Sequence, residues 1–322
     1  MFPVERLRRY RLNGNIRNMF RETSINPDKL IMPVFVDETE KSKTAIKSMP
    51  GIYRYSLPEY EKYIMHLEEI GVKNIIIFGI PAKKDSCGTS SYDRNGIVQR
   101  AISSAKKNTS LNTIADLCLC EYTDTGHCGV IENGYVNNDK TLEIYGREAV
   151  SYAEAGVDMV APSGMMDGQV GAIRDALDKD GFINTLIMAY SSKFASNLYG
   201  PFRDAADSTP QFGDRKSYQM DYHNGNEAMR EIDLDIQEGA DVIMVKPALF
   251  YLDMIYRAKE YYNMPLATYM VSGEYSMIKN AISSGLLSPD TAMEALTSLF
   301  RAGSDLVITY FAEDYIANHG RL

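Results

Sequence analysis

A short motif recurs four times along the chain and constrains its fold more than any other feature. In each copy an amphipathic stretch ends in Gly, one residue follows (two in the first copy), and then Asp or Asn precedes an apolar run. Gly takes the left-handed conformation that ends a helix, and the polar turn leads into a strand. The apolar runs do not alternate with polar residues, which predicts strands buried on both faces of a parallel sheet. The copies are EEIGVKNIIIFGI (Gly71), EAGVDMVAPS (Gly156), QEGADVIMVKP (Gly239) and RAGSDLVITYF (Gly303).

The same criterion predicts eight strands, with helical patterns between most of them. Eight β/α units over about 290 residues indicate an α/β fold, a (β/α)8 TIM barrel. A doubly wound open sheet is the alternative, but no G-x-G-x-x-G follows any predicted strand, which weakens it. The predicted strands span residues 30–36, 75–80, 113–119, 158–163, 185–191, 241–247, 266–271 and 305–311.

The charge of the chain is unevenly distributed. The net charge is −9, yet residues 1–30 hold seven Lys and Arg against three Asp and Glu. The acidic body argues against a nucleic-acid-binding surface. We therefore predict an N-terminal arm over residues 1–28, which packs on the acidic body of a neighbouring subunit, and a barrel domain over residues 29–322. An RNA-binding arm is the alternative.

The composition limits the cellular compartments in which the protein is expected. No apolar run reaches the roughly 18–20 residues that span a bilayer, so no membrane association is expected. The basic N-terminus lacks an apolar core, so we expect no secretory signal. The chain has only four Cys, which favours a reducing cytosol, and Cys87 stands alone in a predicted loop.

Three of the cysteines form a candidate metal site. Cys118 and Cys120 are two residues apart at the end of a predicted strand, so their side chains share a face. Cys128 follows a turn-rich stretch that can fold back toward them. Three thiolates favour Zn²⁺ and leave a fourth position for water or substrate, as in catalytic sites. The alternative is two buried strand cysteines and an unrelated loop cysteine, and His127 could be a ligand instead of Cys128 or beside it.

Two lysines are candidate nucleophiles. Lys193 follows one predicted strand by two residues, and Lys246 ends the next strand, directly before Pro247. Consecutive strands are neighbours in a barrel, so the two amines should be close. Partial burial and a second ammonium group both lower the pKa of a lysine and free its amine to attack a carbonyl. The alternative is a pair of rim lysines whose ammonium groups reach solvent.

A long segment, residues 192–222, lacks clear periodicity and follows a strand. Such segments are usually lids or binding loops, and this one lies where barrel active sites occur. Its Arg203 and Arg215 suit carboxylates or phosphates, although solvated loop charges are an equal alternative. Ser272 and Tyr310 end the seventh and eighth predicted strands on the same face, and each, taken alone, is better explained as a structural hydroxyl.

Several segments in register resemble porphobilinogen synthase, the 5-aminolevulinate dehydratase family, in its zinc-cysteine form. The likeness extends from about Pro3 to Tyr315, and its motifs are specific because they occur in the same order. The zinc-binding segment of the family resembles DLCLCEY (116–122) with GHCG (126–129). The other matching segments are APS (161–163), SSKFAS (191–196), GPFR (200–203) and VKP (245–247).

The resemblance implies condensation of two 5-aminolevulinate molecules into porphobilinogen, with loss of two waters, in tetrapyrrole and heme biosynthesis. Lys246 would form a Schiff base with the substrate that becomes the propionate side of the product, and Lys193 would do so with the second substrate. Asp116 and Ser163 would be active-site neighbours. Zinc, which would help to bind and activate the second substrate, would be held by Cys118, Cys120 and Cys128.

The resemblance also implies binding residues and an assembly. Arg203 and Arg215 would clamp the carboxylate of the second substrate, and Ser272 with Tyr310 would hold that of the first. A stimulatory Mg²⁺ away from the active site would use Glu231, the one protein ligand that the match includes. The family is usually an octamer with embracing N-terminal arms, which agrees with the charge asymmetry.

Two other functions compete with this interpretation. A class I aldolase is also a barrel with a Schiff-base lysine, but it needs no thiolate metal, so the Cys-x-Cys segment speaks against it. A zinc-binding regulatory protein on a degenerate barrel would bind metal without any trapped substrate adduct. A borohydride-trapped adduct therefore separates the enzymes from the regulatory protein.

Overall fold

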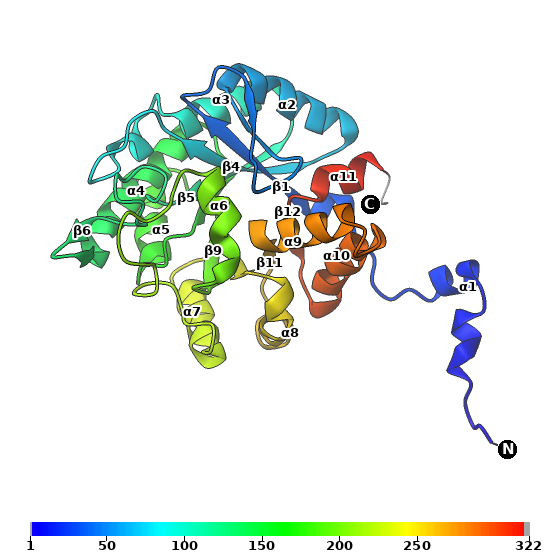
Figure 1. Cartoon of the computed structure of the whole chain (residues 1–322). Coiled ribbons are helices and arrows are strands. Elements are labelled where there is room, and N and C mark those ends of the chain that lie inside the picture. Colours follow the sequence, from blue (N-terminus) through cyan, green and yellow to red (C-terminus); the bar gives the residue numbers. More distant parts are fainter. Residues whose placement is uncertain (1, 319–322) are drawn as a thin grey trace.

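The computed structural model describes residues 2–318, and its centre is a closed barrel of eight parallel strands (Figure 1). The barrel closes because the last strand pairs with the first, at Leu30↔Val307 and Ile31↔Ile308. This closure confirms the predicted (β/α)8 barrel and excludes the open sheet. The strands, in barrel order, are β1 (Leu30–Asp37), β4 (Asn74–Ile80), β5 (Asn112–Leu117), β8 (Met159–Pro162), β9 (Leu186–Lys193), β10 (Val242–Lys246), β11 (Leu266–Met270) and β12 (Leu306–Thr309).

Helices surround the strands, and the barrel core is filled by their apolar side chains. A small extension joins β1 at its C-terminal end, formed by β2 (Lys43–Ala45) and β3 (Tyr53–Tyr55), and β6 (Ile131–Glu132) pairs with β7 (Tyr135–Val136). None of the described helices has the length and apolarity to cross a membrane. They are α1 (Gly14–Met19), α2 (Leu57–Ile70), α3 (Ile97–Asn108), α4 (Asn138–Glu154), α5 (Gln169–Lys179), α6 (Gly200–Ala205), α7 (Gly225–Gln237), α8 (Leu252–Tyr261), α9 (Ser272–Ser283), α10 (Asp290–Ala302) and α11 (Ala312–Ala317).

The recurring Gly ends a helix in each of the four copies of the motif. The φ angles of Gly71, Gly156, Gly239 and Gly303 lie between 97° and 120°. Residues with a side chain rarely adopt such angles, so the motif requires glycine there. The chain then turns directly into β4, β8, β10 or β12.

The Asp of the motif has a second function, which the sequence pattern does not reveal. In three copies its carboxylate accepts a hydrogen bond of 2.7–2.9 Å from the main-chain N–H near the start of the preceding strand in the barrel. Asp158 accepts from Thr113, Asp241 from Ile187 and Asp305 from Leu266. These aspartate bridges link neighbouring strands at the N-terminal end of the barrel, the end opposite to the predicted site.

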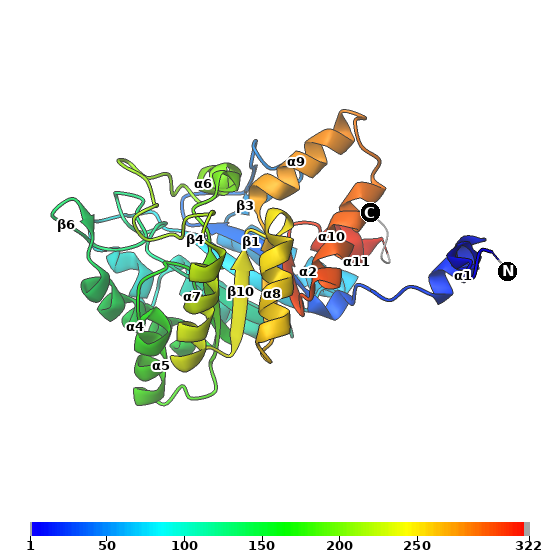
Figure 2. The same cartoon turned by 90° about the horizontal axis from the view of Figure 1, so that it is seen from below.

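The N-terminal segment lies apart from the barrel in both views (Figures 1 and 2). It contains α1, and several of its apolar side chains are exposed: Phe2, Val4, Leu7, Leu12, Met19 and Phe20. The binding of this segment to a neighbouring subunit stays a prediction. Met1 of the predicted arm and residues 319–322 of the predicted barrel domain lie outside the described residues.

The aspartate bridges predict a stability effect that is independent of the active site. Asp241→Ala removes the acceptor of the Ile187 N–H, and Asp241 has no ion-pair partner among residues 2–318 to complicate the result. We expect a loss of about 1–3 kcal/mol in the free energy of unfolding, measured by urea denaturation. Asp241→Asn keeps an oxygen acceptor and should lose less. Asp175→Ala, at an exposed position on α5, is the control; equal losses in Asp241→Ala and this control would contradict the bridge.

Candidate active site

Two lysines end neighbouring strands at the C-terminal end of the barrel. Lys193 is the last residue of β9, Lys246 is the last residue of β10, and the two residues are direct partners in the parallel register. Lys193 thus lies within the strand rather than two residues beyond it. Both side chains are buried, at 4% and 5% exposure, so they are not rim lysines that reach solvent.

Aromatic rings enclose the ammonium group of Lys246. Its Nζ lies 4.3 Å from the centre of the Tyr269 ring and 4.9 Å from that of Tyr190, with Tyr199 and Phe202 both at 5.3 Å. Burial, followed by the nearby charge of Lys193, lowers the pKa of Lys246 to about 7. A large fraction of the amine is therefore neutral near neutral pH, as a nucleophile requires.

A buried carboxylate lies beside the two lysines. Asp116 on β5 accepts a hydrogen bond from the Ser163 hydroxyl at 3.2 Å, and the main-chain oxygen of Ser163 accepts one from Nζ of Lys193. Burial raises the pKa of Asp116, while the charges of Lys246 and Lys193 lower it in part. The carboxylate can therefore exchange a proton with groups bound near the amines.

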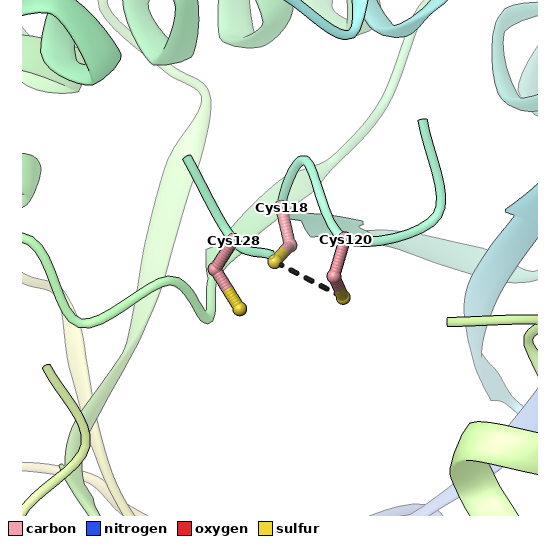
Figure 3. Close-up of side chains that lie close together, drawn as sticks. All are labelled: Cys118, Cys120 and Cys128. Carbon is pink, nitrogen blue, oxygen red and sulfur yellow. Dashed lines mark hydrogen bonds between the residues drawn. The ribbon is translucent and has the colours of Figure 1, made fainter. Parts of the chain in front are cut away.

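The three predicted cysteines converge on one point (Figure 3). The Sγ atoms of Cys118, Cys120 and Cys128 lie within 4.8 Å of one another, and all three residues are buried. The Cys118 thiol donates a hydrogen bond to Sγ of Cys120 at 3.4 Å. The strand was predicted to reach residue 119, but β5 ends at Leu117, so the first two cysteines lie in the turn after it. This turn brings them to face the returning loop.

Charge around this cysteine cluster favours a thiolate. Hydrogen bonds from Cys118 and Cys120, followed by the charges of Arg215 and Lys193, lower the pKa of Cys128 well below its usual value. The Glu121 carboxylate accepts a hydrogen bond from the Cys120 thiol at 3.1 Å. A compact, buried set of three sulfur donors suits a soft divalent ion such as Zn²⁺, with room for a fourth ligand.

His127 does not join the cysteine cluster. Its Nδ1 lies 3.0 Å from the Tyr218 hydroxyl, and its Nε2 lies 3.0 Å from the main-chain oxygen of Phe212. Both ring nitrogens are therefore engaged with the long segment, and the alternative in which His127 is a metal ligand is not supported. The histidine instead joins the cysteine loop to that segment.

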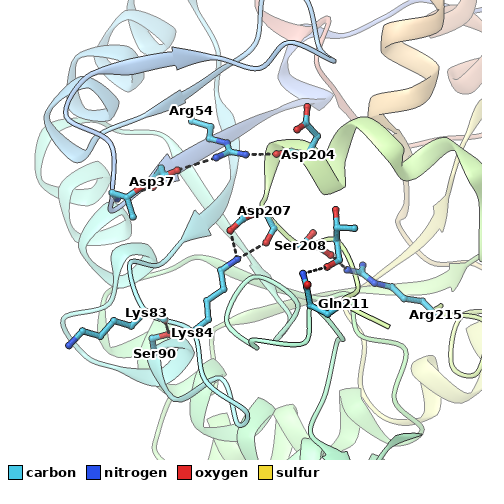
Figure 4. Close-up of polar contacts among 12 residues, drawn as sticks. Asp37, Arg54, Lys83, Lys84, Ser90, Asp204, Asp207, Ser208, Gln211 and Arg215 are labelled. Atoms are coloured by element: carbon cyan, nitrogen blue, oxygen red, sulfur yellow. Dashed lines mark hydrogen bonds and ion pairs between the residues drawn. The ribbon is translucent and has the colours of Figure 1, made fainter. Parts of the chain in front are cut away.

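The long segment was predicted over residues 192–222, but its first two residues belong to β9. The remainder, residues 194–222, covers the C-terminal end of the barrel and is called the lid below. It was predicted to lack regular structure, but it contains α6 and a short 3-10 helix, Asn197–Tyr199. Polar contacts fix it to surrounding loops (Figure 4). Arg54 donates to the main-chain oxygen of Asp204, Lys84 binds the Asp207 carboxylate at 2.7 Å, and the main-chain N–H of Gln211 donates to Thr125 at 2.9 Å.

The two lid arginines differ in their surroundings. Arg215 is buried and donates to the main-chain oxygens of Gly126 and Ser208, at 2.9 and 2.6 Å. Arg203 is half-buried, and its Nε has no hydrogen-bond partner among the described residues. Burial and then the charge of Arg215 lower the pKa of Arg203, so the two cations are near each other. Two neighbouring guanidinium groups with N–H donors that have no partner among residues 2–318 suit an anionic ligand.

Ser272 and Tyr310 follow the strands β11 and β12 rather than ending them. Ser272 is the first residue of α9, and its hydroxyl oxygen accepts a hydrogen bond from the Phe202 N–H of the lid at 2.9 Å. The Tyr310 hydroxyl lies 2.9 Å from the Tyr269 hydroxyl. Both residues are therefore on the same end of the barrel as the lysines, but the structure gives no hydrogen bond between them.

Sequence reasoning missed several residues of this region. Tyr190 and Tyr269, whose rings enclose Lys246, are single aromatics within apolar strands and resemble ordinary core residues in the sequence. Gln219 in the lid is buried, and neither atom of its amide has a partner within residues 2–318. No pattern in the sequence distinguishes that glutamine from the polar residues around it.

Two other predicted residues lie outside the lysine and cysteine region. Glu231 on α7 lines a cleft of about 390 Å³ together with Asp167, Glu227 and Asp221. Among the described residues, the three cysteines are the only group of three His, Cys, Asp or Glu side chains close enough to hold a metal ion. Cys87 is exposed and free, in the loop before α3.

Comparison with known proteins finds similarity over nearly the whole chain. The family model described as delta-aminolevulinic acid dehydratase matches residues 4–318. Delta-aminolevulinic acid dehydratase from Archaeoglobus fulgidus is 54% identical over 314 residues, which cover 97% of each chain. The same-named protein of Bacillus subtilis is 49% identical over 311 residues, 96% of each. The crystal structure of the Toxoplasma gondii enzyme with its reaction product porphobilinogen is 41% identical, with a TM-score of 0.95 over 99% of this chain and 92% of that one.

The lysine pair predicts a measurable shift in reactivity. Lys193→Met removes the neighbouring charge, so the pKa of Lys246 should rise above about 7, toward the ordinary lysine value. We expect its acetylation by acetic anhydride, measured by mass spectrometry across a pH series, to begin at higher pH. Lys193→Arg retains the charge and should retain the low midpoint. The same midpoint in the Met and Arg variants would contradict a charge effect.

Proposed function

Because the chain belongs to the delta-aminolevulinic acid dehydratase family, we propose that it condenses two molecules of 5-aminolevulinate into porphobilinogen with loss of two waters. The observation that carries this proposal is the pair of buried lysines at adjacent strand ends, next to a cluster of three cysteines. Joining two ketones through amine catalysis requires two amines within reach of each other. An aldolase would require only one lysine and no cysteine cluster.

The neutral amine of Lys246 attacks the ketone carbon of the first substrate in this proposal. A C–N bond forms, the ketone oxygen leaves as water, and an imine joins the substrate to Nζ. The aromatic rings around Nζ exclude water that would reverse this step. Asp116, whose pKa is raised chiefly by burial, can supply and recover the proton that the departing oxygen needs.

Lys193 forms the second imine, and the second substrate lies between this lysine and the cysteine cluster. The supporting observations are the register pairing of the two lysines and the effect of the Lys193 charge on Cys128. Zn²⁺ held by Cys118, Cys120 and Cys128 would supply a Lewis acid that polarises a carbonyl oxygen. The three thiols fit that ion because they are buried and close together, and because the pKa of Cys128 lies well below its usual value.

The carboxylates of the two substrates need cationic or hydroxyl partners. We assign the carboxylate of the second substrate to Arg203 and Arg215 in the lid, since these cations are near each other and the Nε of each has no hydrogen-bond partner within residues 2–318. We assign that of the first substrate to Ser272 and Tyr310. The Ser272 oxygen accepts from the lid, which leaves its own O–H free to donate to a carboxylate.

Three further features of the proposal rest on the family resemblance and on local chemistry. The acidic cleft around Glu231 would hold a Mg²⁺ ion that stimulates the enzyme. The arm, residues 1–28, would bind neighbouring subunits of an octamer. Four free cysteines suit a reducing cytosol.

The first test of the proposal is a direct assay for porphobilinogen combined with borohydride trapping. We expect 5-aminolevulinate with borohydride to label Lys246, and Lys246→Ala to abolish both the label and turnover. Chelation of the metal should stop turnover but leave the label, because an imine needs an amine and not a Lewis acid. Lys179→Ala, at an exposed position on α5, is the control. Absence of product with Zn²⁺ and reduced thiols would contradict the proposal.

The second test concerns the arm. Deletion of residues 1–28 should leave a folded barrel but a smaller assembly. The segment that contains α1 lies apart from the barrel, and most of the apolar side chains of the arm are exposed. Sedimentation velocity measures the mass of the assembly, and circular dichroism checks the fold. An unchanged large oligomer after the deletion would show that the arm does not hold the subunits together.

A further inference from the structure

Glu274, in the first turn of α9, is a fully buried carboxylate with main-chain partners only. Its exposed fraction is 0%, and among residues 2–318 no Lys, Arg or His pairs with it. Burial of an unpaired carboxylate is unfavourable unless hydrogen bonds compensate for the lost water. The partners of this carboxylate therefore indicate what it stabilises.

The two carboxylate oxygens of Glu274 bind two different loops. Oε1 accepts hydrogen bonds from the N–H of Leu249 at 2.6 Å and from that of Ala248 at 3.1 Å. Oε2 accepts one from the N–H of Val271 at 2.7 Å. Ala248 lies two residues after Lys246, the last residue of β10. Val271 directly precedes Ser272. One side chain thus links the segment after the nucleophilic lysine to the turn that carries the carboxylate-binding serine.

Both linked segments also hold the lid. The main-chain oxygen of Lys246 accepts a hydrogen bond from the N–H of Phe194 at 3.0 Å, at the start of the lid. The hydroxyl of Ser272 accepts one from the N–H of Phe202 at 2.9 Å. A shift between the two segments would therefore move the lysine, the serine and the lid relative to one another.

We propose that Glu274 is a positioning residue for the reaction, which fixes Lys246 and Ser272 at the spacing that one substrate molecule requires. This inference rests on the proposed function, because that spacing matters only if the lysine binds the ketone and the serine binds the carboxylate of the same molecule. Glu274 does not touch the reacting atoms. It acts through the main chain of both segments, and a misplacement of about 1 Å in such a site can reduce the rate by about 100-fold.

Glu274→Gln is the informative variant because it keeps the size of the side chain and removes half of its acceptor function. The amide nitrogen of glutamine is a donor and would face a main-chain N–H of one of the two loops. We expect borohydride trapping at Lys246 to become about 10- to 100-fold slower, and KM for 5-aminolevulinate to rise. Burial raises the pKa of Glu274 to about 7, so assays at about pH 8.5 compare glutamine with an ionised carboxylate.

Asp241→Ala is the matched control, because it also removes an acceptor for a main-chain N–H but at the opposite end of the barrel. At comparable losses of thermal stability, the control should retain the wild-type trapping rate and KM. Glu274→Asp keeps the charge, but its shorter side chain can reach only one loop well, so it should show an intermediate loss. It also provides the test if the Gln variant does not fold.

The outcomes separate the positioning role from the proposed function. Trapping at Lys246 in both Glu274 variants at the rate of the Asp241→Ala control would overturn the positioning role and leave the function intact. Failure of the wild-type protein to form any trapped adduct would overturn the function itself. A slower rate with higher KM, confined to the Glu274 variants, would support both.

Discussion

The central physical constraint in this molecule is the placement of two lysine side chains at one register position of neighbouring strands, inside a closed barrel. Two ammonium groups removed from water repel each other and lose hydration, so both cannot remain fully charged. The structure resolves this conflict at Lys246, whose pKa is lowered by burial and by Lys193 to about 7. The buried Asp116, the cysteine cluster and the aromatic rings lie around this pair. The charges of both lysines lower the pKa of Asp116, and that of Lys193 lowers the pKa of Cys128.

The lid and the loop that carries the three cysteines form one hydrogen-bonded unit near the lysine pair. His127 and Tyr218 contact each other, and the main-chain N–H of Cys128 donates to the Tyr218 hydroxyl at 3.4 Å. Arg215 adds a bond to the main-chain oxygen of Gly126. The groups that would hold a metal ion are thus fixed by the same contacts that place the lid cations. Under the proposed function, substrate binding and metal binding would therefore depend on a shared set of hydrogen bonds.

The sequence predicted those parts of the fold that depend on local patterns. Unbroken apolar runs located all eight barrel strands, and the Gly motif marked the start of four of them, because helix ends and buried strands have short-range signatures. Lys246 and the three cysteines were found because lysine at the end of an apolar strand and Cys-x-Cys are unusual residue patterns. Contacts between distant segments were not predictable. Neither the engagement of His127 by Phe212 nor the bridge from Glu274 to Ala248 has any spacing signal, since 85 and 26 residues separate the partners.

The aspartate bridges have a consequence for how such a chain can change over time. They join neighbouring strands at the end of the barrel opposite to Lys193, Lys246, the cysteine cluster and the lid. The hydrogen bonds that stabilise the barrel thus lie at one end of the strands, and the candidate active site lies at the other end. Mutations in the loops around the two lysines leave the aspartate bridges in place. Substrate specificity can therefore change without loss of the closed barrel. The recurrent Gly-x-Asp unit then serves the closure of the barrel, and the loops at the opposite end can vary without disturbing it.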